Sequence, residues 1–217
     1  ALHPKEEIAT ARFPLIRHIA VRDTLADAPA FDVGTTGWQR TAPETVARFT
    51  AVGYFFAREI HRQTGVPIGI VQSSFGGTRI EAWMSAAAFA SDPVFAAIGD
   101  RWKRDNSVPY AERKAAFDAA LAAWEGGETA ALAVGGEAHR QFVKAHRRPL
   151  APITPQQAPS VLFNGMINPL VPYALRGVLW YQGESNGWAP VGDQHPAVDY
   201  RRQFPALTEA WRKHFER

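Results

Sequence analysis

Two short apolar segments, each followed at once by a polar, glycine-containing stretch, constrain the fold of this chain more than any other feature. Residues 66–72 (VPIGIVQ) run into residues 73–78 (SSFGGT), and residues 176–181 (RGVLWY) run into residues 182–186 (QGESN). Both apolar segments are typical of buried strands. Because parallel sheets bind ligands at the carboxyl ends of their strands, we expect the two polar stretches to form the candidate site.

The first part of the chain predicts a strand followed by a helix. Residues 15–21 alternate as a strand does. Residues 41–44 (TAPE) have the form of a capping box that begins a helix, and Gly65 is placed to end it. The apolar residues at helical spacing between them are Val46, Phe49, Val52, Phe56 and Ile60. A strand–helix–strand order with glycine-rich strand ends predicts an α/β fold, a mainly parallel sheet covered by helices.

A long alanine-rich stretch follows, and it predicts a helical excursion. Residues 86–145 are rich in Ala, Glu, Lys and Arg, with large apolar residues at helical spacing. We expect the helices to be interrupted near Pro109 and again at Gly126 and Gly127, because proline and paired glycines break helices.

The remaining segments complete a single domain. Residues 149–159 read as a Pro/Gln linker, so that residues 86–158 form a helical insertion and linker within one domain of 217 residues. Residues 161–173 predict a short helix and a turn, and residues 200–215 predict a closing amphipathic helix.

Composition excludes several classes of function. The net charge of +3 comes from scattered basic residues, which argues against a nucleic-acid surface. The absence of cysteine excludes disulfides, thiolate nucleophiles and Cys-based zinc sites. No histidine pair has metal-ligand spacing, so we predict neither a metal nor another cofactor. No apolar run approaches the ~18 residues of a membrane span.

The stretch at residues 182–186 combines groups that acyl transfer requires. It offers the amides of Gln182 and Asn186, the unhindered backbone of Gly183, the carboxylate of Glu184 and a hydroxyl. Amide donors can hold a developing oxyanion, and a carboxylate can orient an imidazole. The alternative is a polar turn in which Glu184 and Asn186 only cap the loop.

Residues 183–187 also match G-x-S-x-G, the nucleophile elbow that would make Ser185 the attacking group. An elbow needs a helix directly after the serine, whereas residues 188–192 (WAPVG) are poor helix formers. The candidate acids and histidines downstream crowd onto one loop and one helix; they are Asp193, His195, Asp199 and His214. We interpret the match as chance.

The stretch at residues 73–78 is predicted to be the second wall of the site. Gly76 and Gly77 let backbone N–H groups approach a ligand closely, as an oxyanion hole or a phosphate cradle requires. No Gly-Lys-Ser/Thr sequence is present, so this is not a P-loop. The alternative is a tight turn capped by its serines and threonine.

Four blocks in order resemble sialate O-acetylesterase-type carbohydrate esterases. They are residues 65–83, residues 162–170 (LFNGMINPL), residues 176–186 and residues 200–212. The resemblance implies the SGNH/GDSL superfamily, with a three-layer α/β/α, flavodoxin-like fold and a mainly parallel sheet. In that family the nucleophilic serine lies in a Gly-Gln-Ser-Asn motif upstream, and the histidine lies in an Asp-x-x-His motif downstream. Neither motif occurs here, so we expect a piece of a longer polypeptide, inactive alone, or a broken homologue.

The resemblance also assigns roles to particular residues. Gly76 or Gly77 would give an oxyanion N–H, and Gln182 with Gly183 would form the loop that donates amide hydrogen bonds. Glu184 would support the histidine, a role that an Asp before the histidine fills in many relatives of the superfamily. Whether Gln182 or Asn186 is the amide donor stays open. Candidate substrate-binding residues are Asn186, Ser74, Trp83, Asn164 and Trp188, with Trp180 and Tyr181 as further aromatic candidates.

The expected function is hydrolysis of acetyl esters on sugars by a Ser–His mechanism. The partner would be an acetylated carbohydrate, of the sialic acid or the plant-glycan type. Two alternatives stay open: a non-catalytic carbohydrate-binding protein with the same fold, and an α/β-hydrolase that uses Ser185. The family suggests a secreted or periplasmic protein, and the sequence leaves the oligomeric state open.

Overall fold

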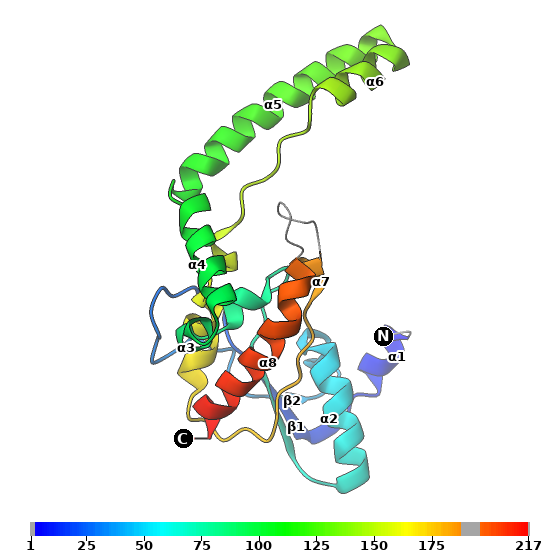
Figure 1. Ribbon diagram of the computed structural model, residues 1–217. Helices are drawn as coiled ribbons and strands as arrows, with labels where there is room; N and C mark the ends of the chain where they lie inside the picture. The colour runs from blue at the N-terminus through cyan, green and yellow to red at the C-terminus, as the bar shows by residue number, and fades with distance from the viewer. Residues whose placement is uncertain (1–2, 188–195, 217) are drawn as a thin grey trace.

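The molecule consists of a small α/β body and a long helical arm that projects from it (Figure 1). The computed structural model describes residues 3–187 and 196–216. The arm is a hairpin of two helices, α5 (Tyr110–Val134) and α6 (Gly136–Ala145). The body holds the sheet and the remaining helices, so the candidate site has to be sought there.

Three strands form the sheet, in the order β2 (Gln39–Thr41), β1 (Phe13–Ala20) and β3 (Ile68–Gln72). β1 pairs with β3 in parallel and with β2 in antiparallel orientation. The two strands predicted in the first part of the chain are therefore confirmed, and the fold is mixed α/β.

Helix α2 (Ala51–Thr64) joins β1 to β3 and packs on one face of the sheet, where Gly53 lies against the Ile70 side chain. Gly65 ends the helix in the left-handed conformation, with φ +70°, as predicted. The predicted start was wrong. Thr41 belongs to β2 and donates its hydroxyl to Ile16 O over 3.0 Å, so Thr50 caps the helix instead.

A second layer of short elements builds the larger of two apolar clusters. Its elements include η2 (Ile80–Trp83), α3 (Ala86–Ala90), α4 (Pro93–Asp105), the single π-helical turn η4 (Phe163–Ile167) and α8 (Pro196–Phe215). Gly165 is required in η4, because a Cβ there would lie 2.2 Å from Thr24 O. The predicted closing helix is confirmed by α8, which accommodates Pro205 in its interior. The shorter elements are α1 (Pro4–Ala9), η1 (Val46–Arg48), η3 (Pro155–Gln157), η5 (Asn168–Leu170) and α7 (Glu184–Gly187).

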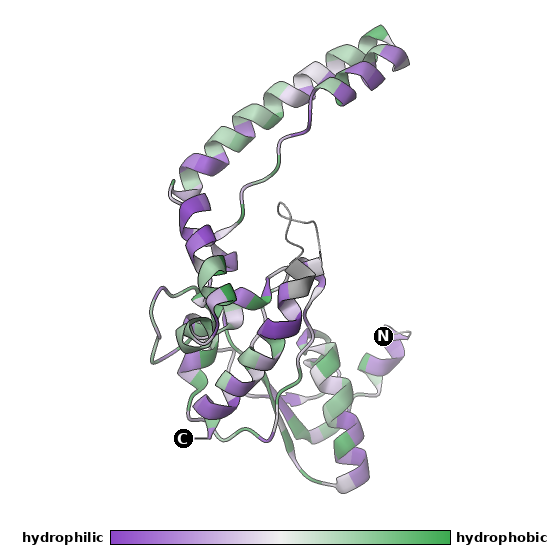
Figure 2. Cartoon of the chain, viewed as in Figure 1, coloured by the Kyte–Doolittle hydropathy of each residue, from purple (hydrophilic) through white to green (hydrophobic). Residues whose placement is uncertain are grey.

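The helices of the arm are interrupted at a different position from the one predicted. Pro109 is the residue before α5, as expected, but Gly126 and Gly127 lie inside that helix. The break falls at Gly135, whose φ of +134° is a conformation that favours glycine. The pale colours of α5 in Figure 2 reflect its alanines, which propagate a helix through two glycines.

The strand predicted at residues 176–181 is not formed. Within the described residues, no strand pairs with this segment, which runs past the sheet in an extended course. Val178 and Leu179 are about half exposed, and only the indole of Trp180 packs into the body. A run of apolar residues becomes a strand only where another strand satisfies its backbone hydrogen bonds.

Candidate functional site

The first wall of the candidate site is the turn that follows β3. Gly76 and Gly77 are exposed, and Gly77 has a φ of +71°. Gln157 holds this turn from the segment that returns from the arm, because its Nε2 donates to Gly77 O over 2.6 Å and its Oε1 accepts from Arg79 N over 2.8 Å. The described part of the chain offers no acceptor to the N–H groups of Gly76 and Gly77. Both are therefore available to a ligand.

The second wall is the loop at Gln182 and Gly183, which comes against the first. Gln182 Nε2 donates to Thr78 O over 2.9 Å and to Asn186 Oδ1 over 2.8 Å. Tyr200 of α8 fixes the backbone here, since its hydroxyl donates to Gln182 O over 3.1 Å. The structure thus brings together the two polar stretches that the sequence singled out.

Asn186 and Glu81 join the two walls underneath. Asn186 is 1% exposed; its Oδ1 accepts from Ile80 N over 2.9 Å, and its Nδ2 donates to Glu81 Oε2 over 3.0 Å. Glu81 is itself 8% exposed. Because buried polar groups require partners, these bonds fix the register of one loop on the other.

A hydrogen-bonded chain supports the carboxyl end of β3. His18 Nε2 lies 2.9 Å from Gln72 Oε1, and Gln72 Nε2 donates to Ser74 Oγ over 3.0 Å. Burial lowers the pKa of His18 below its ordinary value, against the smaller opposing effect of the Gln72 hydrogen bond. Ser74 is exposed at the end of this chain, beside the glycine turn.

The other predicted site residues lie in different surroundings. Glu184 is exposed at the start of α7, where its carboxylate remains accessible. Trp83 is 4% exposed in the core, and Asn164 is 6% exposed and donates to Ala26 O. This placement gives no support to substrate contacts by Trp83 or Asn164. Trp188, Asp193 and His195 lie outside the described residues.

The structure around Ser185 does not support the interpretation of residues 183–187 as a nucleophile elbow. Ser185 lies in α7, a helix of four residues, and the segment before it is not a strand. An elbow needs a strand that leads directly into a sharp turn and a helix.

Sequence reasoning missed three residues that hold the walls: Glu81, Gln157 and Tyr200. Glu81 stands in the block at residues 65–83, shortly after the glycine turn, so its position was a usable signal. Tyr200 begins the block at residues 200–212. Gln157 lies in the stretch read as a linker, and nothing in its local sequence marks it.

In the part of the chain that the structure describes, no helix is long and apolar enough to cross a bilayer. The same residues contain no group of three or more His, Cys, Asp or Glu side chains that could hold a metal ion.

Comparison with known proteins shows that the chain is similar to carbohydrate esterases. No protein-family model matches it. A sialate O-acetylesterase of Rattus norvegicus is 31% identical over 218 residues, which cover 97% of this chain and 35% of that relative. A sialate O-acetylesterase of Homo sapiens is 27% identical over 215 residues, which cover 96% of this chain and 31% of that relative. A crystal structure of a carbohydrate acetylesterase from Xanthomonas citri matches 99% of this chain and 34% of its own, with a TM-score of 0.65 and 29% identity.

Within that class, the chain is sialate O-acetylesterase-like over almost its whole length, which confirms the resemblance seen in the motifs. The chain spans about a third of the length of the relatives it matches.

Proposed function

We propose that this chain supplies the oxyanion-stabilising and supporting loops of a serine-dependent carbohydrate O-acetylesterase. The observation that carries the proposal is the junction of the glycine turn and the 182–186 loop through Gln182 and Asn186. The similarity to sialate O-acetylesterases and to a carbohydrate acetylesterase supports the reaction class. The serine nucleophile and the histidine base would come from residues outside this chain.

Backbone N–H groups are the favoured oxyanion donors. In an acetyl ester hydrolysis, a serine attacks the carbonyl carbon, and the tetrahedral oxyanion needs donors at about 3 Å. Gly76 and Gly77 have N–H groups without acceptors among the residues described, and Gly183, with a φ of +153°, has a third. Both amide hydrogens of Gln182 are already committed, so Gln182 positions the loop.

Glu184 is proposed to orient the histidine. A carboxylate that accepts from one imidazole nitrogen holds the ring in the tautomer that can take the serine proton. Glu184 is exposed directly after the Gly183 backbone, so its carboxylate can meet a histidine from another part of the polypeptide. Collapse of the tetrahedral intermediate breaks the ester bond, and the sugar oxygen leaves with the proton held by the histidine. Water then hydrolyses the acetyl-enzyme and releases acetate.

The fold proposed for the whole domain is three-layered, α/β/α. Parallel pairing of β1 with β3 and the packing of α2 on one sheet face support it. The structural neighbour supports the same arrangement over nearly all of the chain.

Kinetics in the polypeptide that carries this chain test the proposal. With an aryl acetate, Gln182→Ala should lower kcat/KM on the order of 10²-fold, because the loop that bears the Gly183 N–H loses its anchor. Glu184→Gln should lower kcat and alter its pH profile, whereas the exposed Glu112→Gln on the arm is the matched control. Unchanged kinetics in both site variants would remove this site from the mechanism. Glycan binding without hydrolysis would favour the non-catalytic alternative.

A further inference from the structure

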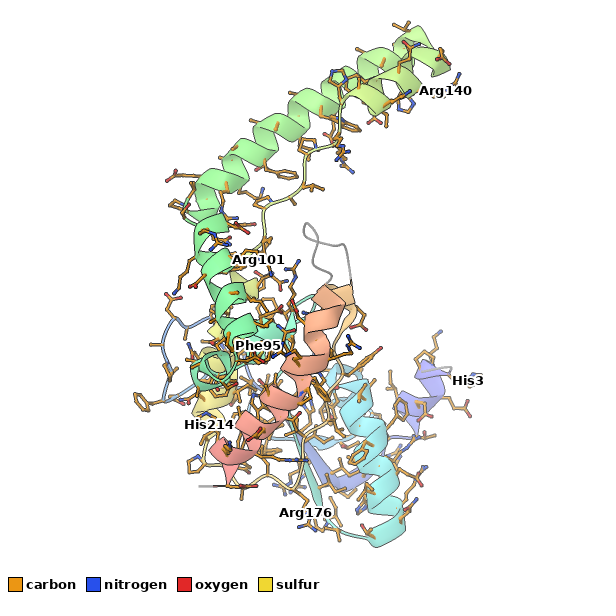
Figure 3. All side chains as sticks on the ribbon, in the orientation of Figure 1. His3, Phe95, Arg101, Arg140, Arg176 and His214 are labelled. Carbon is orange, nitrogen blue, oxygen red and sulfur yellow. The ribbon has the colours of Figure 1, made fainter. Side chains whose placement is uncertain are left out.

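We propose that the cleft at the base of the arm is the saccharide subsite of this protein, and that it holds an uncharged sugar unit. This rests on the proposed esterase function, since it names the part of the substrate that the site would grip. The α4 cleft, as we call it, lies between α4, the turn before η2, residues 153–159 and the start of α8. Figure 3 shows Arg101 on the side of α4 that faces the body.

The α4 cleft is open on one side, so that its hollow of about 650 Å³ includes space open to solvent. Its open side would let a longer glycan extend into solvent while one or two units are held.

The α4 cleft is lined in part by two residues that hydrogen-bond to the candidate catalytic loops. Gln157 lines the cleft and donates to Gly77 O, and Glu81 lines it and accepts from Asn186 Nδ2. A sugar in the cleft would therefore contact two residues that hold the candidate catalytic loops in place.

The lining combines an aromatic ring with hydrogen-bonding groups. Trp102 of α4 contributes a half-buried indole, and Arg101, Asp105 and Arg79 stand around it. A pyranose presents C–H faces that pack on an indole, and hydroxyl edges that bond to carboxylates and guanidinium groups. Such a pairing of an apolar platform with a few polar groups fixes the orientation of a ligand.

The charges of the lining favour a neutral sugar. Among the described residues that line the cleft, the carboxylates of Asp105 and Asp199 accompany the guanidinium groups of Arg79 and Arg101, whereas the buried Glu81 is already bonded to Asn186. An anionic sugar needs an excess of positive charge to offset its desolvation. The carboxylates would repel the carboxylate of a sialic acid, whereas they accept hydrogen bonds from the hydroxyls of a neutral glycan.

Titration calorimetry with the polypeptide that carries this chain tests the subsite directly. The probes are a neutral cello-oligosaccharide, a neutral xylo-oligosaccharide and free sialic acid. We expect a neutral oligosaccharide to bind and sialic acid to bind at least tenfold more weakly. Trp102→Ala should weaken the neutral ligand about tenfold, and Trp102→Phe, which keeps an aromatic face, should retain most of the affinity.

Trp124→Ala is the matched control, because Trp124 is also a half-buried helical tryptophan but lies on the arm outside the cleft. It should leave binding and hydrolysis unchanged. With acetylated oligosaccharides, Trp102→Ala should raise KM far more than it does with an aryl acetate. Asp105→Ala, at an exposed position, should show the same trend if Trp102→Ala folds poorly.

The outcomes separate the subsite from the proposed function. Oligosaccharide binding that depends on Trp102, without any ester hydrolysis, would support the subsite and contradict the esterase proposal. Hydrolysis of acetylated oligosaccharides that is unchanged in the Trp102 and Asp105 variants would support the esterase proposal and contradict the subsite. Preferential binding of sialic acid, or no binding of either neutral oligosaccharide, would overturn the subsite.

Discussion

At the scale of single residues, the site depends on side chains that are buried rather than on those that face solvent. Asn186 and Glu81 lie under the loops and determine how they meet, while Gly76 and Gly77 present only backbone. Catalytic geometry must be held to within about 0.5 Å, so the buried pair should influence activity as well as stability.

Replacing Asn186 with a carboxylate should make stability depend on pH. In Asn186→Asp, an oxygen replaces the Nδ2 that now lies 3.0 Å from Glu81 Oε2. Two carboxyl groups this close share a proton, so one folded pKa is raised above its unfolded value. The variant should therefore approach wild-type stability near pH 4 and lose about 3 kcal/mol as the pH rises to 7.

Urea unfolding across this pH range measures the effect, with wild type as the reference at each pH. The double variant Asn186→Asp/Glu81→Gln reverses donor and acceptor, so it should recover most of the stability and the wild-type pH profile. Equal loss at every pH in Asn186→Asp would mean that the two side chains do not interact.

His18 should make the protein sensitive to mild acid. Its folded pKa is lowered by burial, so below about pH 6.5 the unfolded chain takes up a proton that the folded chain excludes. Stability should fall with decreasing pH through this window, at up to about 1.4 kcal/mol per pH unit, until His18 itself is protonated. His18→Gln should flatten the fall between pH 7 and 5. A slope equal to that of wild type would contradict this assignment.

At the scale of elements, local patterns identified most helices and the two parallel strands β1 and β3, but not β2. The alternation at β1 and the amphipathic pattern of α8 each reflect a face that is buried in the structure, whereas the apolar run at β3 is only half-buried. Residues 176–181 carry an equally apolar pattern but lack a neighbouring strand, a fact that no local pattern contains. The start of α2 was missed because the pairing of Thr41 in β2 is a tertiary contact.

The candidate site, like the fold, could be predicted from the sequence only where the signal is local. The polar stretches at residues 73–78 and 182–186 were found because their glycine-containing composition is local, and they meet in space. The burial of Trp83 and Asn164, and the anchoring role of Gln157, depend on segments distant in sequence. Side-chain composition alone does not distinguish a tryptophan in a core from one in a groove.

The glycine pair in α5 offers a matched comparison. A Cβ at Gly126 would meet nothing within 4 Å, whereas one at Gly127 would lie 2.7 Å from Phe142 Cε2 on α6. Gly126→Ala should stabilise the arm by up to about 1 kcal/mol through helix propensity. Gly127→Ala should lose that gain, because Phe142 must move from its place against Trp124. Amide hydrogen exchange in α5 and α6 reports both effects, and equal protection in the two variants would contradict the packing.

At the scale of the whole molecule, the arm and the body are built differently. The helices α5 and α6 contain no buried residue and pack mainly on each other, whereas the body has an apolar core. At the junction, Arg113 Nη1 lies 3.4 Å from Ile153 O, so the outgoing and returning chains are close together there. We therefore expect the arm to behave as an insertion whose base, rather than its tip, contributes to the α4 cleft.

Replacing residues 114–151 with a four-residue Gly/Ser linker, which spans about 13 Å, should leave the body folded. The residues of the core and the α4 cleft all remain in this variant. The free energy of unfolding of the body, measured in denaturant, should therefore change by no more than about 0.5 kcal/mol. Near-ultraviolet circular dichroism should keep the signal of the tryptophans packed in the core, while the far-ultraviolet helical signal falls. Binding of a neutral oligosaccharide should persist as well, because Trp102 and Gln157 lie outside the deleted stretch. A body that loses cooperative unfolding on this replacement would show that the arm is part of the folding unit and not an insertion into it.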